Sequence, residues 1–326
     1  MALNAASVPA GAAQPAGNLP QQSLRPLPPP PAQFYPPPGS DTGVVRPVPH
    51  EFGPAALAER VWRAAAEAQR GSVLAVSSAD GGVGRSTVVA VLGGLLALAV
   101  PGPVIALDAN PRPWGGLGER VGTGSGSVWD AVRELPRLHS RTEVERWTRK
   151  GPSGLLALAG EVEATAYRHP PAHHQLMSVA AALRRLYPLV LLDLMMAEAR
   201  GTWEALAGAS AALLVARATP DSIAHTLRLM AFQRNAATPQ GPAAPLLVVV
   251  ATSPRVPAEV RAALRQAATV AAAVHTIPYD PMLAKATPVD ARLLARSTRR
   301  ALLGLAADVL QRCPPATGAA SVAAAS

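Results

Sequence analysis

The chain has 326 residues, which is enough for one large α/β domain or two small ones with a substantial buried core. Its single cysteine, Cys313, excludes an internal disulfide and a thiolate metal cluster, so we expect a reducing compartment, the cytoplasm. The formal net charge of +9 would suit nucleic acid or an anionic lipid surface, but we favour solubilising arginines on helix faces as its cause.

Residues 1–52 form a first segment that is rich in proline, glutamine, alanine and glycine. Thirteen of the 34 prolines lie within the first 50 residues, with runs at 28–31 and 36–38. This composition cannot bury enough apolar area to fold, so we expect a disordered arm with polyproline II character. Residues 25–31 have the form of a proline-motif ligand, so a protein partner for the arm is one interpretation and a plain spacer is the other.

Short apolar runs alternate with helical patterns in residues 53–312. Their apolar character is continuous, which is typical of strands that are covered on both faces in a parallel sheet. We therefore predict one α/β domain, a doubly wound and mostly parallel seven-stranded sheet with helices on both faces, followed by a flexible tail at 313–326. The predicted strands are residues 73–78, 104–108, 155–159, 189–193, 211–216, 246–251 and 274–277.

The stretch between Arg85 and Asp108 contains no charged residue, but we do not expect it to span a membrane. Gly93-Gly94 and the Pro-Gly-Pro sequence at 101–103 divide it into a helix, a turn and a short buried strand. The tail after residue 313 has no amphipathic membrane helix either. We therefore expect no integral membrane segment.

A glycine-rich turn follows the first predicted strand. From Ala79 to Thr87 it reads Ala-Asp-Gly-Gly-Val-Gly-Arg-Ser-Thr, and an apolar helix is predicted directly after it. A phosphate-binding loop requires this context, because glycines let backbone N–H groups point inward and a helix N-terminus favours negative charge. The alternative is that the glycines only close a tight turn. The candidate phosphate contacts are Gly81, Gly82, Val83, Gly84, Arg85, Ser86 and Thr87.

The loop resembles the deviant Walker A loop of the MinD/ParA family of P-loop ATPases, whose usual pattern is Gly-Lys-Gly-Gly-x-Gly-Lys-Ser/Thr. Four further segments follow in the family's order. Residues 104–111 end in Asp-Ala-Asn-Pro and are similar to the family's second strand, and residues 187–193 are similar to its Walker B strand. Residues 213–222 contain the family's Thr-Pro turn, and residues 275–280 resemble its Ile-Pro-x-Asp segment.

The resemblance implies ATP or ADP and Mg²⁺ as cofactors. It places Ser86, Asp108 and Asp193 around the metal, with Asp108 and Asn110 near the attacking water as the catalytic candidates. It places Pro278 and Asp280 beside the adenine. It also implies a homodimer, or a heterodimer with a related ATPase.

Several positions depart from the family pattern. Asp80 stands where the family has its signature lysine, Arg85 where it has the loop lysine, Asn110 where it has a second aspartate, and Ala79 where it has the first glycine. The asparagine that often recognises adenine is missing from residues 250–253. An arginine keeps the positive charge but is not interchangeable with a compact ammonium. We therefore expect nucleotide binding with weak or absent hydrolysis.

Arginines gather on the last predicted helix, where Arg292, Arg296, Arg299 and Arg300 share one broad face. ParA-like proteins bind DNA nonspecifically through such arginines, so Arg296, Arg299 and Arg300 are the candidates for DNA contact. A solvated face is the simpler interpretation.

Two smaller features have simpler explanations than a functional site. The histidines of residues 169–174 lie among prolines without a neighbouring carboxylate or thiolate, so we interpret them as a solvated loop rather than a metal site. Trp114 follows the second strand and either covers a partner surface or packs internally.

The resemblance predicts a nucleotide-binding regulator of spatial organisation or partitioning. Two alternatives stay open. One is a catalytically silent scaffold or heterodimer subunit, such as the MinD-like proteins associated with type VII secretion. The other is a ParA-like module that tethers to DNA.

Overall fold

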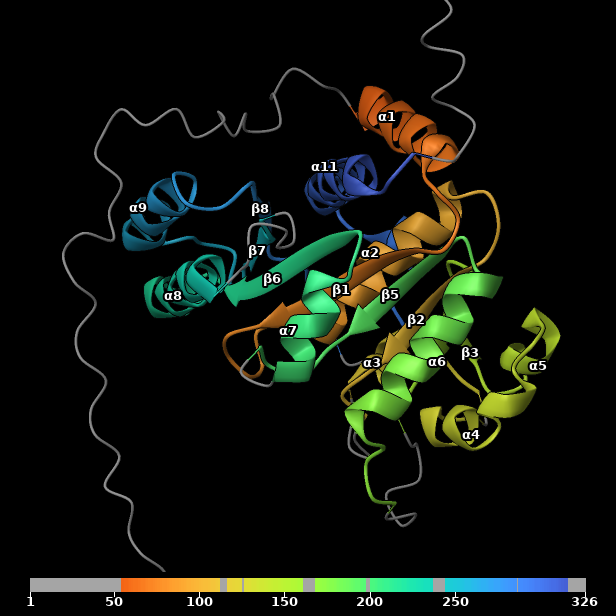
Figure 1. Cartoon of the computed structure of the whole chain (residues 1–326). Helices are drawn as coiled ribbons and strands as arrows, with labels where there is room; N and C mark the ends of the chain where they lie inside the picture. The colour runs from red at the N-terminus through yellow and green to blue at the C-terminus, as the bar shows by residue number, and fades with distance from the viewer. Residues whose placement is uncertain are drawn as a thin grey trace, which may run out of the picture. The chain divides into compact units, whose positions relative to one another are not determined.

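The computed structural model describes residues 54–111, 116–124, 126–160, 168–197, 200–236, 244–285 and 287–315. In this part of the chain eight strands form one sheet in the order β3-β4-β2-β5-β1-β6-β7-β8 (Figure 1). All neighbours are parallel except β3, which pairs antiparallel with β4 at the edge. The strands are β1 (Ser72–Ser78), β2 (Val104–Asp108), β3 (Arg149–Lys150), β4 (Leu156–Leu158), β5 (Leu189–Asp193), β6 (Ala211–Arg217), β7 (Leu246–Val250) and β8 (Val274–Ile277).

The expected fold class is confirmed, and so are the seven expected strands. The prediction of seven was one short, because β3 has only two residues and both are basic, which gives no apolar run. The helices are α1 (Pro54–Glu67), α2 (Arg85–Ala99), α3 (Leu117–Val121), α4 (Val128–Arg133), α5 (Arg141–Glu145), α6 (His173–Leu186), α7 (Arg200–Ala207), α8 (Pro220–Ala236), α9 (Ala258–Ala267), α10 (Pro281–Ala284) and α11 (Arg296–Arg312), with 3-10 turns η2 (Leu135–Arg137) and η3 (Ala291–Leu293).

Every strand except β3 contributes to two apolar layers, one on either face of the sheet. Leu74 and Val76 of β1 belong to the layer that includes residues of α1, α2 and α11, whereas Val73 and Ala75 belong to the layer that includes residues of α6, α8 and α9. Successive side chains of a strand point to opposite faces, so both sets must be apolar. This double coverage explains the continuous apolar runs in the sequence.

Helix α2 lies close to the sheet and to the segment before β4. A Cβ atom on Gly93 would come within 2.9 Å of Leu155 Cδ2, so a larger residue there would require the Leu155 side chain or the helix to shift. Ten of its residues, from Thr87 to Leu96, are buried. The buried helix holds its first residue, Arg85, at the carboxyl ends of the central strands.

Helix α1 packs against α11, and the chain returns to the end of α1 after residue 312. Cys313 is buried, the N–H of Gln69 donates to the carbonyl of Pro314 at 2.7 Å, and Pro315 forms a bridge with Ala68. Residues 313–315 of the expected tail therefore contact the domain.

The last helix begins later than the arginine pattern suggested. Arg292 lies in η3, where Asp290 accepts a hydrogen bond from its backbone N–H and forms an ion pair with its guanidinium at 2.8 Å. Placing Arg292 on the last helix was therefore wrong, and α11 begins at Arg296.

The arm at 1–52, Trp114 and residues 316–326 lie outside the described residues. Within the described part, no helix combines the length and the apolar character needed to cross a bilayer.

Candidate functional site

The glycine-rich loop joins β1, which lies between β5 and β6 in the sheet, to the N-terminus of α2. Gly82 and Gly84 have φ angles of 67° and 93°, a left-handed conformation that residues with a Cβ rarely adopt. Gly84 is the N-cap of α2 and supplies no capping side chain. The first turn of α2 therefore has unmatched N–H groups and the positive end of the helix dipole, which favour an anion.

Two carboxylates lie next to each other beside this loop. Asp108 and Asp193 end the neighbouring strands β2 and β5 and are register partners. Both are buried, with 2% and 1% of their surface exposed. Asp108 accepts hydrogen bonds from the backbone N–H groups of Asn110, at 3.0 Å, and Gly160, at 3.2 Å. The sheet thus places Asp108 beside Asp193, and Asn110 follows Asp108 by two residues.

Arg85 points back into the protein and pairs with one of these carboxylates. Its Nε donates to Asp193 Oδ1 at 3.0 Å, and its Nη1 donates to the hydroxyl of Ser78 at 3.0 Å. Only 13% of the Arg85 side chain is exposed. The structure therefore places the loop cation against the carboxylate that the sequence assigned to the metal.

The carboxylate pair is electrostatically strained because both groups are buried. Burial, followed by repulsion from Asp193, raises the pKa of Asp108 to about 7. Burial also raises the pKa of Asp193, against the opposing effects of the Arg85 charge and a hydrogen bond from Ser86. Such a pair attracts a cation, and Arg85 is the one that the described residues supply at hydrogen-bonding distance.

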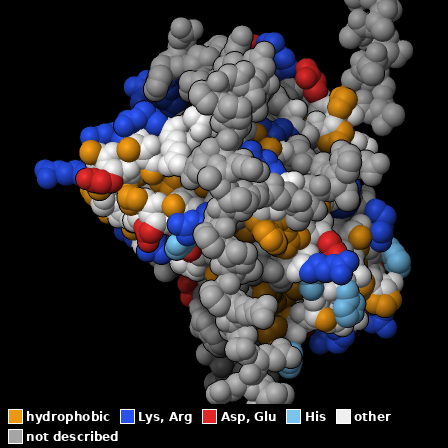
Figure 2. Space-filling model, turned by 60° about the vertical axis from the view of Figure 1, so that its left-hand side comes forward, with side chains coloured by type: hydrophobic (Ala, Val, Ile, Leu, Met, Phe, Trp, Pro, Cys, Tyr) orange, Lys and Arg blue, Asp and Glu red, His pale blue; other side chains and the backbone are white. Residues whose placement is uncertain are grey.

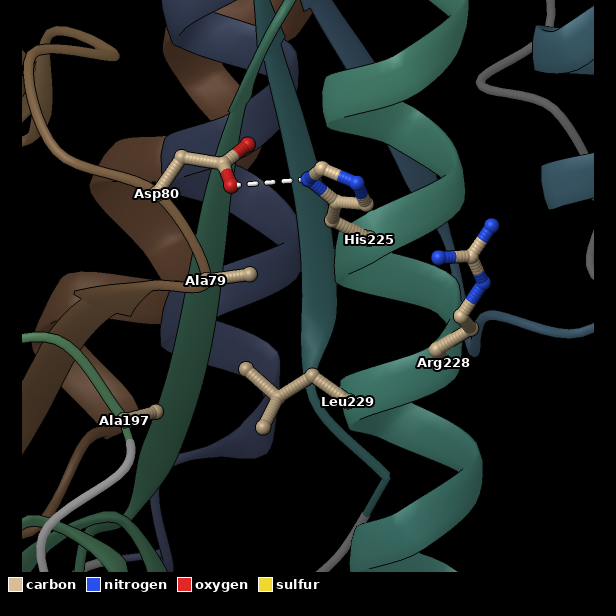
Figure 3. A pocket seen from close by; sticks show the side chains of 6 residues that line it. All are labelled: Ala79, Asp80, Ala197, His225, Arg228 and Leu229. Atoms are coloured by element: carbon tan, nitrogen blue, oxygen red, sulfur yellow. Dashed lines mark hydrogen bonds and ion pairs between the residues drawn. The ribbon is translucent and has the colours of Figure 1, made fainter. Parts of the chain in front are cut away.

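Asp80, at the signature-lysine position, is tied to helix α8. Its Oδ2 accepts a hydrogen bond from Ser222 Oγ at 2.7 Å, and its Oδ1 lies 3.0 Å from His225 Nδ1 (Figure 3). Its backbone carbonyl accepts from Ser78 Oγ, the hydroxyl that Arg85 also contacts. Asp80 therefore binds groups of its own chain, and the beginning of the loop is anchored to α8.

The remaining predicted residues lie at other places. Asp280 is buried at the start of α10, where it accepts hydrogen bonds from the N–H groups of Met282, at 3.0 Å, and Ala295, at 2.8 Å. Its carboxylate thereby holds the turn that follows Pro278. Arg296 and Arg299 are exposed in the first turn of α11, and Arg300 is half-buried.

Sequence reasoning missed the partners that orient the loop. Ser222 and His225 lie more than 140 residues beyond Asp80 in the sequence, and Gly160 lies 52 residues beyond Asp108. Arg120, whose guanidinium donates to the carbonyls of Leu283 and Lys285, also adds positive charge near Asp193. The Thr-Pro turn before α8 was recognised, but no local pattern marked Ser222 or His225.

Solved structures share this arrangement of strands and helices. A ParA family ATPase from Chlorobium tepidum TLS aligns with a TM-score of 0.57 at 16% identity, covering 73% of this chain and 98% of that one. The MinD cell division protein of Aquifex aeolicus aligns with a TM-score of 0.51 at 19% identity, covering 76% and 99%. The fold is that of the ParA and MinD ATPases.

A third ParA/MinD-type structure, the septum site-determining protein MinD of Pyrococcus horikoshii OT3 complexed with Mg-ADP, aligns with a TM-score of 0.51 at 18% identity. It covers 73% of this chain and 95% of that one. Sequence identities this low show that the fold is similar, but they do not show a shared ligand or activity. No known family profile matches the sequence, and no curated protein matches it.

Proposed function

We propose that this ParA/MinD-type chain binds ATP or ADP with Mg²⁺ and acts as a nucleotide-responsive regulator of spatial organisation or partitioning. The observation that carries the proposal is the loop itself: two left-handed glycines and a helix N-terminus beside a buried pair of carboxylates. The residues fit the group, because the helix end attracts phosphate and carboxylates with a hydroxyl suit Mg²⁺.

Each predicted residue has a role in this proposal. The backbone of Gly81, Gly82, Val83 and Gly84 and the side chains of Arg85, Ser86 and Thr87 would contact the phosphates, and Pro278 and Asp280 would border the adenine. Ser86, Asp108 and Asp193 would hold Mg²⁺, which supplies charge neutralisation at the phosphates when it is bound. Ser86 already hydrogen-bonds Asp193, which supports the grouping.

We propose that hydrolysis is weak or absent. Arg85 has one guanidinium, and Asp193 and Ser78 engage it, so a phosphate has to compete for it. Asp80 is held by Ser222 and His225 and offers no cation to a partner. Asn110 lacks the carboxylate that would orient water with Asp108. Phosphoryl transfer depends on positioning and charge together, so these differences compound.

Titration calorimetry with ATP and ADP, each with and without Mg²⁺, tests the binding. Weak binding that improves with Mg²⁺ is expected, and Gly84→Ala should abolish it, while Arg200→Ala, an exposed arginine paired with Glu204, should not change it. No heat at millimolar nucleotide in the unmodified chain would exclude this function and leave the silent scaffold, for example in type VII secretion. The Arg85–Asp193 pair, which gives one of the two carboxylates a counter-ion without a ligand, favours that second candidate.

Turnover assays test the hydrolysis part separately. The triple variant Asp80→Lys, Arg85→Lys and Asn110→Asp should gain more turnover than the sum of the single changes, because the three positions act as a unit. Asp80→Lys alone also removes the bond to Ser222, so we expect little from it. Rapid turnover by the unmodified chain would contradict the proposal. An inert triple variant that still binds Mg-ATP and dimerises would show that the deficiency lies outside these three positions.

We propose a homodimer, or a heterodimer with a related ATPase, and a separate protein partner for the arm at 1–52. If the chain binds DNA, Arg296 and Arg299, both exposed, are the first candidates, with Arg300 beside them. Replacing all three with alanine should lower both the affinity for duplex DNA and its salt dependence, because fewer counterions are released. Unchanged binding would place the contact elsewhere, and no binding at low salt would exclude DNA tethering.

A further inference from the structure

A small surface pocket lies between the beginning of the glycine-rich loop and helix α8. Its volume is about 310 Å³. Figure 3 shows His225 and Leu229 pointing from α8 toward the loop, whereas the Arg228 side chain extends from the same helix away from the loop. The lining residues are Ala79, Asp80, Ala197, His225, Arg228 and Leu229.

The pocket has an apolar floor, and its available polar groups are the Arg228 guanidinium and the second ring nitrogen of His225. Ala79, Ala197 and Leu229 offer only methyl groups. Both carboxylate oxygens of Asp80 already have partners, Ser222 and His225. Arg228 is exposed, and within the described part of the chain it has neither an ion pair nor a hydrogen bond. A ligand with an apolar group and a carboxylate would therefore satisfy the pocket.

Large exposed apolar side chains belong to two of the segments that line the pocket. On α8, Phe232 follows Arg228 by four residues, so it lies on the same helix face, and it is 63% exposed. Met195 and Met196, which follow β5, are 43% and 40% exposed. Exposed methionine and aromatic side chains are typical of surfaces that bind other proteins.

The surroundings of the pocket are positively charged, which favours a partner with negative charge. In the described residues from 211 to 270, which include α8 and α9, there are six arginines and two acidic residues, Asp221 and Glu259. Helices α8 and α9, which carry four of these arginines, contact each other. Figure 2 turns the side of these helices toward the reader and shows Lys and Arg side chains next to hydrophobic ones.

We propose that the pocket is the docking site for an acidic segment of a partner protein, which inserts one apolar side chain against Leu229 and places a carboxylate on Arg228. A nucleic acid would match the charge but would leave the apolar floor and the methionines without a suitable contact. Because Asp80 both lines the pocket and belongs to the glycine-rich loop, the partner would lie against the nucleotide-site loop. Docking itself does not require nucleotide, so it can succeed or fail independently of the proposed ATP binding.

Fluorescence polarisation with the full chain and a labelled, end-blocked peptide Glu-Asp-Leu-Leu-Glu-Asp tests this docking. Binding is expected, and it should weaken about tenfold when serines replace the leucines or when glutamine and asparagine replace the acids. The ring signals of His225 in NMR spectra should shift with the acidic leucine peptide. A labelled thymidine oligonucleotide serves as the nucleic-acid comparison.

Matched variants locate the contact. Arg228→Gln should weaken the peptide about fivefold, whereas Arg265→Gln, which removes the same charge from exposed α9, should have little effect. Neither side chain is buried, so both variants should fold. Four results would each overturn the proposal. The first two are equal losses of affinity in the two variants and equal binding of the peptide in which serines replace the leucines. The others are tighter binding of the oligonucleotide than of the peptide, and no peptide binding at all.

Discussion

Arg85 shows how one replacement in a phosphate-binding loop changes its resting state. Its guanidinium has five donors in a planar fork, so it can contact Asp193 and Ser78 at the same time. A lysine ammonium is a compact point charge that cannot reproduce both contacts in the same plane. Asp193 therefore has a counter-ion that is covalently part of the loop.

Removing this counter-ion should destabilise the fold. Arg85→Ala leaves Asp193 buried beside Asp108, and we expect a loss of about 3 kcal/mol in the free energy of unfolding at about pH 8. The loss should shrink in mildly acidic buffer, because the raised pKa of Asp193 lets it take up a proton. Urea denaturation measures both values, and Arg200→Ala, in an exposed pair, is the control. Equal stability of Arg85→Ala and the parent chain at both pH values would show that the pair contributes nothing.

Asp108 should make stability depend on pH. The pKa of Asp108 is about 7 in the folded chain, whereas the ordinary pKa of an aspartate, which applies to the unfolded chain, is 3.8. Between these two pH values the folded state holds a proton that the unfolded state has released. Stability should therefore fall as the pH rises through this window. Asp108→Asn should flatten the slope in denaturation series, although a lost backbone hydrogen bond costs about 1 kcal/mol at every pH. A slope unchanged by the substitution would assign it to another group.

At the scale of elements, the turn into α2 requires glycine at position 84 more than at position 81. Gly84 has a φ of 93°, and an added Cβ would lie 3.7 Å from Val250 Cγ1, whereas Gly81 has no positive φ and an added Cβ there would lie 4.0 Å from Met196 Sδ. Gly84→Ala should cost about 1–2 kcal/mol of stability, and Gly81→Ala should cost little. Thermal unfolding of the two variants provides the comparison, and similar melting temperatures would contradict the strained turn.

Most strands were predictable because they are buried on both faces and carry continuous apolar runs. Edge strand β3 was not, since Arg149 and Lys150 look like any exposed pair. The start of α11 was misjudged because Asp290 caps a separate turn that includes Arg292, and charge spacing alone does not reveal a cap. Local patterns thus locate elements well and their boundaries less well.

The candidate site was predictable where it is contiguous or ends a strand. The loop from Gly81 to Thr87 and the two strand-end aspartates follow from the sequence order. The direction in which a side chain points does not, because it depends on groups brought together only by the fold. Arg85 meets a carboxylate 108 residues away, and Asp80 meets Ser222 142 residues away.

At the scale of the whole molecule, the residues that follow α11 and α1 form backbone hydrogen bonds with each other. A chain that stops at residue 312 loses buried Cys313 and the hydrogen bond from Gln69 to Pro314 that a chain stopping at 315 keeps. We expect the shorter chain to be about 1–2 kcal/mol less stable. Calorimetric melting of the two truncated chains tests this, and identical curves would show that residues 313–315 are dispensable.

The strand order also governs when the protein can assemble during synthesis. Strand β1 pairs with β5 and β6, which are translated more than 100 residues later, so the nascent β1 and the apolar helix after it wait without partners. At about 5–20 residues per second, the wait lasts on the order of ten seconds. The glycine-rich loop, near the start of the domain in sequence, can therefore reach its folded setting only after β5 and β6 have been translated, and a chaperone that shields α2 would act in this interval.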